Sequence, residues 1–467
     1  MRRRGNLAAL VASLLAGCMV GPDYQRPADP AAEQFVQGEH DSLTPAAVRA
    51  DWWQGFNDPL LVELIEAGLA ENHDLRVASQ NLAIARARLG DSEWQRLPRS
   101  ELGSEVSRTR TSQEVSSASQ PTENRYSADF SISWELDVFG RVRRLVEAAE
   151  AGVQASAEDL HDVQVMVSAD IATGYLSLRA AQLRLQVARQ NGDIQQQTVE
   201  LTEALLEGGQ GNAVDVQLSR AQLATTRAGI PVLEADVQQA MHRIAVLTGR
   251  PPTALRERLS PVTSLPATPT TVEIGTPYAL LQRRPDVRAA ERRLAATTAR
   301  IGVATADLYP RFDLAGLLGV AAREFSSLSA GTAETWRIGL GVTWPAFDLQ
   351  RAQLAVEISE AEMQAQLARY QQSVLVALEE TETALVRYLK NRERLAHARD
   401  AAVASRDAAA LSRERFQAGA SGFLAVLEAE TRRLEAEDRL AQAEAALGLS
   451  LVTLYRSLGG APGLANP

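Results

Sequence analysis

The chain has 467 residues, of which only 5% are aromatic, and its formal net charge is −10. Abundant Ala, Gln, Glu, Arg and Leu favour long helices that pack through small side chains over a thick globular core. An acidic chain without a basic stripe argues against nucleic acid as a partner. No window approaches the ~20 apolar residues of a membrane-spanning helix, so a membrane crossing would have to use strands.

The first residues predict a cleaved leader followed by an acylated cysteine. Three arginines, Arg2 to Arg4, precede an apolar run and the sequence Leu15-Ala16-Gly17-Cys18, as in a secretory signal. The pattern resembles a bacterial lipoprotein signal, in which residues 1–17 are removed and Cys18 becomes the lipidated first residue. Met19 then implies sorting to the outer membrane. The alternative is an ordinary secretory signal with a chance cysteine; because Cys18 is the only cysteine, the chain forms no internal disulfide.

Helix and strand signals follow the leader in a fixed order. Residues 18–57 lack periodicity and predict an extended, lipidated tether. The next helix is capped by Asn57 or Asp58 before Pro59, and it has a possible break near Asn72. Strands at 102–110 and 126–138 then precede helices at 141–207 and 213–247. The first of these helices would be about 100 Å long at ~1.5 Å per residue, and Pro231 predicts a kink or an early end in the second.

The strand at 126–138 alternates with a period of two. Its even positions are all apolar, and its odd positions are Ser, Asp or Glu. A run of ~10 residues with an aromatic residue near its end suits a tilted strand that crosses a bilayer. We expect one face, toward lipid or the headgroup boundary, to carry Phe130, Ile132 and Trp134, and the other, toward a water-filled lumen, to carry Asp129, Ser131 and Ser133.

The same order starts again after a connector at 250–277. Trp134 and Gly209 recur as Trp344 and Gly419 at an offset of 210, and Leu97-Pro98-Arg99 recurs as Tyr309-Pro310-Arg311 at an offset of 212. The first copy therefore covers residues 58–249 and the second 278–460, with a tail at 461–467. The second copy predicts strands at 312–321 and 335–344 and helices at 349–417 and 423–458.

Four strands cannot close a barrel within one chain. An open sheet edge in hydrocarbon leaves backbone groups unpaired, which costs several kcal/mol for each group. Closure therefore requires several identical chains, and cyclic symmetry gives 8, 12 or 16 strands.

Four motifs resemble those of the lipid-anchored outer-membrane factors of resistance-nodulation-division efflux pumps, the TolC-like family. They are the segments at 18–27 (CMVGPDYQRP), 51–53 (DWW), 134–141 (WELDVFGR) and 280–292 (LLQRRPDVRAAER). The resemblance extends from Cys18 to Gly460. It implies a mainly helical, duplicated chain that forms, as a homotrimer, a 12-stranded outer-membrane β-barrel on a long periplasmic α-helical barrel. It also implies docking to a periplasmic adaptor (membrane fusion protein) that links the channel to an inner-membrane pump, which makes the chain the passive exit duct of a tripartite efflux system.

The resemblance places two candidate sites around the helix at 423–458. Leu424 and Glu428 match the positions that line a closed periplasmic aperture, where the basic partner of the family is replaced by Thr431, so that Arg432 or Arg433 would have to substitute. The alternative for Glu428 is a solvated helix face. Glycine-rich turns at 208–212 and 418–422 would form the tip that docks the adaptor, and the alternative is that their glycines only reverse a helix. The tip glycines are Gly208, Gly209, Gly211, Gly419 and Gly422.

Other residues are expected to anchor or stabilise the channel. The tryptophans suited to the membrane interface are Trp134, Trp336 and Trp344. Arg283, Arg284 and Asp286 mark the family and are expected to act structurally at a helix start.

No enzyme signature is present in the sequence. The five histidines lack ligand spacing and no HExxH motif occurs, so we expect no catalytic site, no metal and no cofactor apart from the covalent lipid on Cys18. A periplasmic adaptor and a structural coiled-coil lipoprotein without channel activity are the alternatives. Neither requires a duplicated helical chain with strand pairs long enough to cross a bilayer.

Overall fold

The computed structural model describes residues 19–28, 33–112, 114 and 122–460. The first copy of the duplication, with the segment before it, contains β1 (Leu43–Thr44), η1 (Trp52–Phe56), α2 (Pro59–Glu71), α3 (His73–Trp94), β2 (Arg99–Arg110), β3 (Thr122–Leu136), α4 (Arg141–Glu207) and α5 (Ala213–Leu247). The second copy, with the connector before it, contains α6 (Arg256–Leu259), β4 (Val272–Glu273), α7 (Pro277–Arg283), α8 (Pro285–Ala306), β5 (Arg311–Ala322), η2 (Phe325–Ser329), η3 (Gly331–Ala333), β6 (Glu334–Thr343), α9 (Leu349–Gln417) and α10 (Phe423–Ser457).

The chain forms two compact units, and each unit uses parts of both copies. The strand unit comprises Met1–Ala28, Gln80–Ala157 and Ala289–Gln372. The hairpin unit comprises Asp29–Ser79, Glu158–Arg288 and Ser373–Pro467. The long helices α4 and α9 contribute to both units, so the boundaries of the duplication and those of the compact units do not coincide.

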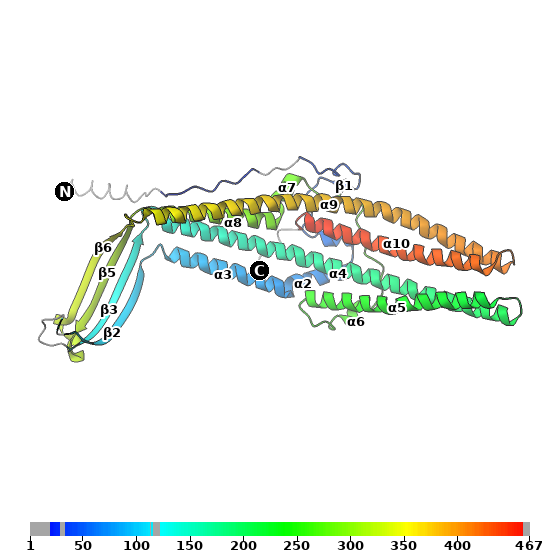
Figure 1. The fold of residues 1–467 in the computed structure, drawn as a ribbon, viewed down its shortest axis with the longest axis horizontal. Helices are drawn as coiled ribbons and strands as arrows, with labels where there is room; N and C mark the ends of the chain where they lie inside the picture. The colour runs from blue at the N-terminus through cyan, green and yellow to red at the C-terminus, as the bar shows by residue number, and fades with distance from the viewer. Residues whose placement is uncertain (1–18, 29–32, 113, 115–121, 461–467) are drawn as a thin grey trace. The chain divides into compact units, whose positions relative to one another are not determined.

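The strand unit contains an antiparallel sheet with the order β2-β3-β5-β6, whose strands lie side by side in Figure 1. Directly paired residues of an antiparallel ladder share a face. Leu102, Phe130, Leu318 and Trp336 are paired in one row across the four strands, so the apolar positions of all four strands lie on the same face. The next row, on the opposite face, contains small and polar residues, namely Gly103, Asp129, Gly319 and Thr335.

Small side chains allow the helices of the strand unit to approach closely. Ala151 on α4 and Ala295 and Ala296 on α8 form a buried cluster, against which Tyr24 packs. Gly302 on α8 lies so close to Arg144 on α4 that a Cβ atom at position 302 would come within 2.7 Å of the arginine side chain. The contact between α4 and α8 therefore depends on alanine and glycine at these positions.

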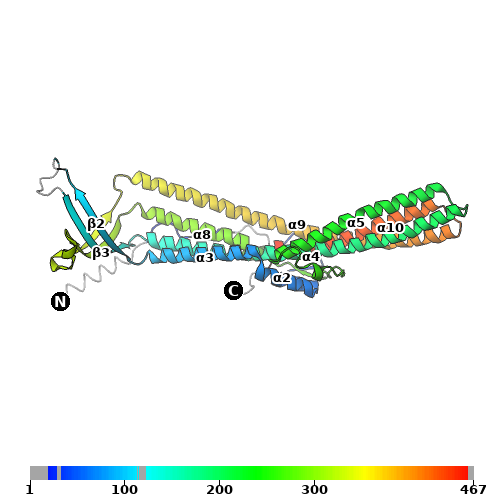
Figure 2. The same ribbon diagram turned by 90° about the horizontal axis from the view of Figure 1, so that it is seen from below.

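In the hairpin unit, α4 reverses into α5 and α9 reverses into α10, as Figure 2 shows. Side chains from α4, α5 and α10 fill the core of this unit, with Ile171, Leu178, Ile244, Leu451 and Leu454 almost fully buried. The helix α5 continues without a break through Pro231, so the predicted early end is wrong. Among the described residues, no helix combines the length and the apolar character that a membrane crossing requires.

The start of α2 and its junction with α3 follow the predicted caps. Asp58 accepts hydrogen bonds from the backbone N–H groups of Leu60 and Leu61, and Pro59 is the first helical residue. The helices α2 and α3 are separated at Asn72, where a break was expected. The Asn72 side chain accepts from the N–H groups of Asp74 and Leu75 and thereby caps α3.

The described part of the predicted tether packs on the body of the chain. In the strand unit, the Val20 N–H donates to the Phe139 carbonyl, and the Tyr24 hydroxyl donates to Glu291 at 2.7 Å. In the hairpin unit, Leu43 and Val272 pair in the short parallel ladder of β1 with β4, and Trp52 stacks on Tyr455 at 5.1 Å. This segment, predicted as an extended tether, is therefore attached to the rest of the chain through its described residues.

Candidate functional site

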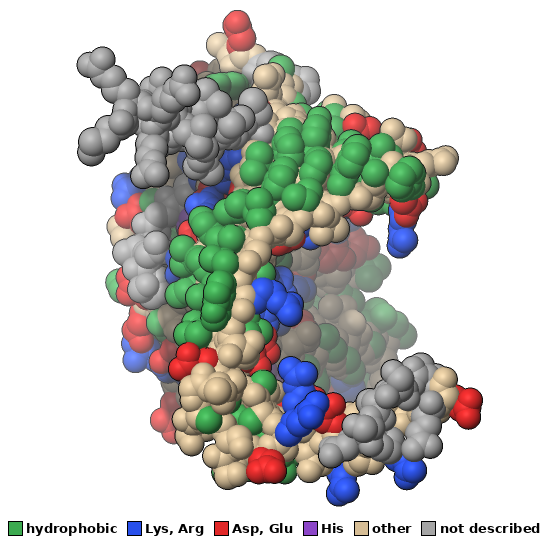
Figure 3. Space-filling model, turned by 90° about the vertical axis from the view of Figure 1, so that its left-hand side faces the viewer, with side chains coloured by type: hydrophobic (Ala, Val, Ile, Leu, Met, Phe, Trp, Pro, Cys, Tyr) green, Lys and Arg blue, Asp and Glu red, His purple; other side chains and the backbone are tan. Residues whose placement is uncertain are grey.

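The most unusual surface of the chain is the apolar face of its sheet. Trp336 is 74% exposed, Ile338 71% and Leu318 65%, although these side chains are among the largest apolar ones in the strand unit. Figure 3 shows hydrophobic side chains gathered in a band on the face that it presents. Monomeric soluble proteins rarely expose contiguous apolar areas of this kind, so the face requires a partner or an apolar medium.

Two of the three predicted interface tryptophans make the same hydrogen bond in the two copies. The Trp134 indole N–H donates to the Arg96 carbonyl at 3.0 Å, and the Trp344 indole N–H donates to the Leu308 carbonyl, also at 3.0 Å. Each indole thus joins the end of its strand to the segment that leads into the hairpin. Trp336 is the most exposed of the three and lies on the apolar face, paired with Leu318.

The predicted tip turns have the same geometry in both copies. Gly209 and Gly419 have positive φ angles of 69° and 71°. The N–H of the following residue donates back to the helix in each case, from Gln210 to the Leu205 carbonyl and from Ala420 to the Arg415 carbonyl. This is a helix C-terminus that glycine closes in the left-handed conformation. A Cβ atom at either glycine would meet nothing within 4 Å, so the turns expose a surface free of side chains.

The other tip glycines have different environments. Gly208 and Gly422 are exposed, and a Cβ atom at Gly422 would meet nothing within 4 Å. A Cβ atom at Gly211 would lie 2.6 Å from the backbone nitrogen of Leu206, so this glycine is required by the fold of the turn itself. Reversal of the helix therefore accounts for Gly209, Gly211 and Gly419, and the open space around Gly209, Gly419 and Gly422 is compatible with the predicted docking surface.

The candidate gate residues lie one helical turn apart on α10. Leu424 is 55% exposed and Glu428 is also exposed, so neither is used in the packing of its own chain. The Thr431 hydroxyl donates to the Leu427 carbonyl at 2.8 Å and supplies no charge. Arg432 is exposed and follows Glu428 by four residues, the spacing at which a glutamate and an arginine on a helix attract each other.

Arg433, the other possible gate partner, is occupied elsewhere. Its side chain is buried and donates to Glu430 at 2.9 Å, to Glu437 at 3.0 Å and to Asn191 on α4 at 3.3 Å. It therefore joins the α9–α10 hairpin to α4 and does not face the candidate gate. The sequence contains a signal that Arg433 packs inward, since the equivalent residue of the first copy is a leucine, Leu223, which is buried.

The two hairpins use the same ion-pair positions with opposite charges. In the first, Arg220 on α5 binds Glu203 on α4 at 2.6 Å. In the second, at an offset of 210, Glu430 on α10 binds Arg413 on α9.

The arginines of the family motif hold the end of α10. Arg284 is buried and donates to the Ser457 carbonyl at 3.1 Å and to Glu380 at 2.7 Å, and it also pairs with Asp286. Arg283 donates to the Val48 and Gly460 carbonyls. Both arginines thus make structural contacts with distant segments of the chain, whereas the sequence predicted structural contacts only at a helix start.

The first copy makes the equivalent contact with an uncharged residue. The Asn72 amide donates to the Leu247 carbonyl at 2.8 Å, and this bond is buried. Asn72 corresponds to Arg284 at an offset of 212, and Leu247 corresponds to Ser457 at an offset of 210. Sequence reasoning did not find this pair of contacts, although the two offsets would have aligned their positions.

One half-buried carboxyl group of the hairpin unit has a raised pKa. Burial, and then the neighbouring carboxylate of Asp286, raise the pKa of Asp162 to about 6, although Arg284 and Arg456 oppose this change. Asp162 lies on α4 beside the ion-pair cluster of the family motif. Its protonation state consequently changes in the pH range of a mildly acidic medium.

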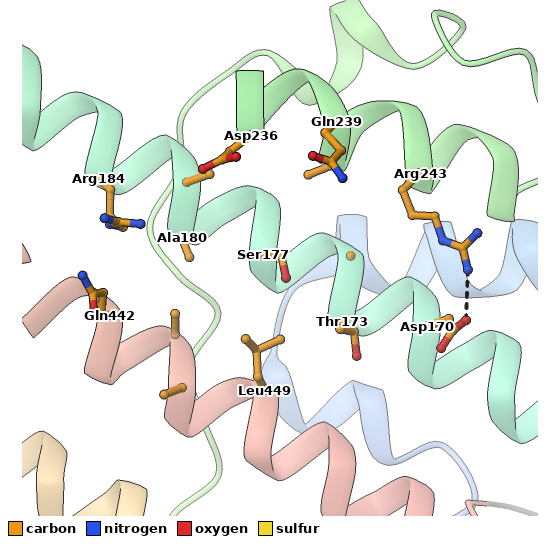
Figure 4. Close-up of a pocket in the computed structure, with 15 residues that line it drawn as sticks. Asp170, Thr173, Ser177, Ala180, Arg184, Asp236, Gln239, Arg243, Gln442 and Leu449 are labelled. Carbon is orange, nitrogen blue, oxygen red and sulfur yellow. Dashed lines mark hydrogen bonds and ion pairs between the residues drawn. The ribbon is translucent and has the colours of Figure 1, made fainter. Parts of the chain in front are cut away.

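A groove between α4, α5 and α10 lies in the hairpin unit and has a cavity volume of about 590 Å³. Figure 4 shows Asp236 and Gln239 on α5 at one side and Gln442 and Leu449 on α10 at the other. Arg243 is held by Asp170 at 3.2 Å, and Arg184 is held by Asp438 at 2.6 Å. Alanines and Gly174 form much of the lining, as in a groove between closely packed helices.

Cys18, the predicted lipid attachment point, lies outside the described residues. So do the predicted leader at 1–17 and the tail at 461–467. The nearest described residue, Met19, lies against Gly140, where a Cβ atom would come within 2.7 Å of the methionine side chain.

Comparison with known proteins identifies the family. A model of the family described as "Outer membrane efflux protein" matches residues 64–250 and 276–460. The chain belongs to the outer membrane efflux protein family. The two matched ranges fall on the two copies of the duplication, one in each.

Individual relatives of this efflux protein cover most of its length. It is 32% identical to nodulation protein T of Rhizobium leguminosarum bv. trifolii over 80% of this chain and 79% of that protein. It is 31% identical to the toluene efflux pump outer membrane protein TtgF of Pseudomonas putida, with 84% of each chain covered. The solved structure of the outer-membrane channel OprN is similar with a TM-score of 0.89 and 41% identity, over 95% of this chain and 99% of that one.

These relatives confirm the predicted fold class and function. The efflux protein has the mainly helical, duplicated fold of solved outer-membrane channels, with a strand-rich portion. It is an outer-membrane efflux channel and, as a member of a transport family, not an enzyme. The alternatives, an adaptor and a structural coiled-coil lipoprotein, are not favoured.

Proposed function

We propose that the chain is the exit duct of a tripartite efflux pump, and that three copies form it. Each copy would contribute its four strands to a 12-stranded barrel in the outer membrane and its long helices to a periplasmic duct. The supporting observation is the sheet, which combines an exposed apolar face, an opposite polar face and two edge strands in the described residues, β2 and β6. An apolar outer band with a polar interior is the arrangement that a barrel in lipid requires.

In this proposal the duct is passive and its partners supply the driving force. The exposed glycine turns at 208–212 and 418–422 dock the tip of a periplasmic adaptor, which links the channel to an inner-membrane pump of the resistance-nodulation-division class. Side chains of an adaptor can approach the backbone closely at Gly209, Gly419 and Gly422, because the space around their Cβ positions is open.

The exposed start of α10 is the proposed periplasmic gate. Three copies of Leu424 and Glu428 would meet around the axis of the trimer and form an apolar and an acidic ring. An acidic ring attracts cations and repels anions, as charged rings do in ion channels. Arg432, one turn beyond Glu428, is the basic residue that can pair with it in the resting state.

Cys18 carries the covalent lipid in this proposal, and no other cofactor is needed. A single acylated residue adds to the grip of the barrel on the membrane without being essential for it. The described residues that follow Cys18 are held on the strand unit by Arg144, which donates to the Val20 and Gly21 carbonyls and binds Asp23 at 2.8 Å. The anchor would therefore stay close to the strand unit of its own chain.

Two measurements test the proposed function together. The mass of the detergent-solubilised complex should equal three chains, and the purified complex should form cation-preferring channels in planar lipid bilayers. A monomeric protein without conductance would contradict the proposal.

A further inference from the structure

The groove between α4, α5 and α10 has the size of a ligand site and is formed by one chain. All of its lining residues belong to the hairpin unit. Its cavity volume of about 590 Å³ falls within the ~300–1,000 Å³ of pockets that hold small organic molecules. The groove therefore needs no second copy of the chain to be complete.

The groove is open because α4 carries small side chains along its floor. Ser177 and Ala180 lie on α4 between the side chains of α5 and those of α10, as Figure 4 shows. At an offset of 210, the equivalent residues of the second copy are Arg387 and Lys390, which are exposed on α9. The first copy thus leaves open a space that the long side chains of arginine and lysine would occupy.

The two walls of the groove are largely apolar. The wall on α5 contains Ala240, and the wall on α10 contains Ala445, Ala446 and Leu449. In Figure 4, Leu449 points from α10 toward α4. Apolar surface on both walls favours a ligand with an apolar body. Short alanine side chains on facing walls favour a flat molecule over a bulky one.

One charge of the groove has no counter-charge. Arg184 binds Asp438 at 2.6 Å, and Arg243 binds Asp170 at 3.2 Å, so both arginines of the lining are neutralised. Asp236 on α5 is exposed, and within the described part of the chain its side chain takes part in no hydrogen bond or ion pair. The carboxylate of Asp236 is therefore free to attract a cation into the groove.

The groove lies on the side of α4 that faces away from the short segments of the hairpin unit. Tyr175 donates to the N-cap residue of α2 at 2.7 Å, and Arg179 donates to the Pro261 carbonyl at 2.7 Å, so α2 and the connector cover that other side. Thr173 and Ser177 each precede one of these residues by two positions, which turns them by ~200° around the helix. In a duct whose wall is one helix thick, α2 and the connector must lie outside, and the groove then faces the lumen.

We propose that this groove binds flat organic cations with a single positive charge on the lumenal wall of the duct. The inference rests on the proposed function and adds a class of molecule that the wall binds. The positive group of the ligand lies beside the Asp236 carboxylate, and its apolar body lies over Ser177 and Ala180. Binding is weak, because an exposed ion pair contributes little in water. Weak binding suits a duct, whose ligands must leave as readily as they enter.

Binding of ethidium, a flat aromatic cation, tests the groove directly. The purified complex in a non-ionic detergent is titrated into ethidium, and fluorescence anisotropy is recorded against a blank of detergent alone. Asp236→Asn should weaken binding about two- to fivefold, as expected for the loss of one exposed ion pair. Thr173→Trp should abolish binding, because the indole ring would occupy the floor of the groove. Thr173 is exposed, so this substitution leaves the core of the hairpin unit untouched.

Glu234→Gln is the matched control for Asp236→Asn. Glu234 lies two residues away on α5, is also exposed, and binds Arg189 at 2.6 Å outside the lining of the groove. Both substitutions remove one negative charge from the same helix, so an effect of net charge alone would weaken ethidium binding equally. Only Asp236→Asn should change the affinity. An anionic aromatic dye, anilinonaphthalene sulfonate, should bind equally to the wild type and to Asp236→Asn.

The outcomes separate the groove from the duct. Equal ethidium affinity of the wild type, Asp236→Asn and Thr173→Trp, in a conducting complex of three chains, overturns the groove and leaves the proposed function intact. Equal weakening by Asp236→Asn and Glu234→Gln overturns it as well, because cations would then be attracted by net charge alone. A complex that is not trimeric or does not conduct overturns the proposed function and the lumenal position of the groove. Ethidium binding to the same sample still decides whether the groove is a cation site, since one chain supplies its whole lining.

Discussion

Substitution of Gly209 and Gly419 by side chains of increasing size distinguishes two roles of these glycines, one in the folding of the tip turns and the other in contact with a partner. Both glycines have positive φ angles near 70°, and a Cβ atom at either would meet nothing within 4 Å. The cost of a substitution within the chain therefore comes from the backbone alone. It amounts to about 1–2 kcal/mol for each non-glycine residue and is smaller for asparagine.

We expect this cost to be the same for alanine and tryptophan, since the space around the Cβ position is open at both glycines. One or two kcal/mol corresponds to roughly 5–30-fold faster local opening. Hydrogen exchange at the Gln210 amide, which donates to Leu205, should accelerate to this extent in both Gly209→Ala and Gly209→Trp. The mass of the complex should remain that of three chains, because the core of the hairpin unit is untouched.

Transport should respond differently from stability. A tryptophan side chain buries 150–250 Å² when packed, so at the tip it would keep a docking partner away from the turn. Efflux of a fluorescent substrate from cells should decline from glycine to alanine to tryptophan, and it should be abolished when Gly209→Trp and Gly419→Trp are combined. Equal efflux in the alanine and tryptophan variants, whether normal or lost, would refute tip docking.

Further predictions concern the gate, the anchor, the interface tryptophans and the half-buried carboxyl group of Asp162. Glu428→Ala should reduce the cation preference of single channels, and an unchanged preference and conductance would refute the acidic ring. Cys18→Ala should keep the trimer while altering its sorting, whereas loss of all folded trimer would show that the barrel is not the main anchor. Trp134→Phe and Trp344→Phe each remove one hydrogen bond, worth about 1 kcal/mol, and should lower the melting temperature of the complex similarly. Asp162 stabilises the fold below about pH 4 and loses this contribution as the pH rises through 6, because its pKa is raised to about 6 in the folded chain. Asp162→Asn should therefore flatten the dependence of thermal stability on pH in this range, and an unchanged profile would contradict the raised pKa.

The sequence predicted the long elements well because glycines and capping residues mark where these elements end. The helix expected at 141–207 is α4, Arg141–Glu207, and its end coincides with the glycines of the first tip turn. The strand expected at 126–138 is β3, Thr122–Leu136. It ends earlier because the Asp137 carboxylate accepts hydrogen bonds from the N–H groups of Val142 and Arg143 and so caps α4.

The contacts made over long sequence separations were not predictable from periodicity. The pairing of β1 with β4 involves only two residues in each strand, so no alternating pattern marks it. Pro231 predicts a kink or an early end of its helix, and α5 does not end there but continues to Leu247, although proline removes one backbone hydrogen bond.

The candidate site could be predicted only in part from the sequence, because the orientation of its side chains depends on how the helices pack. The spacing of Leu424 and Glu428 places them on one face of a helix, and the structure shows that this face is exposed. The roles of Arg432 and Arg433, which are adjacent in the sequence, depend on which one faces α4. A single sequence does not give that orientation directly. Alignment of the two copies indicates the orientation of Arg433, because the equivalent residue of the first copy is the buried Leu223.

The exchanged charges of the two hairpins also bear on how such a chain avoids misfolding. A duplicated chain contains two long helices, α4 and α9, and two helices that return along them, α5 and α10, so two wrong pairings are conceivable. If α10 returned onto α4, Glu430 would meet Glu203, and if α5 returned onto α9, Arg220 would meet Arg413. Like charges in direct opposition disfavour these wrong pairings, so each long helix selects the partner that follows it in the chain.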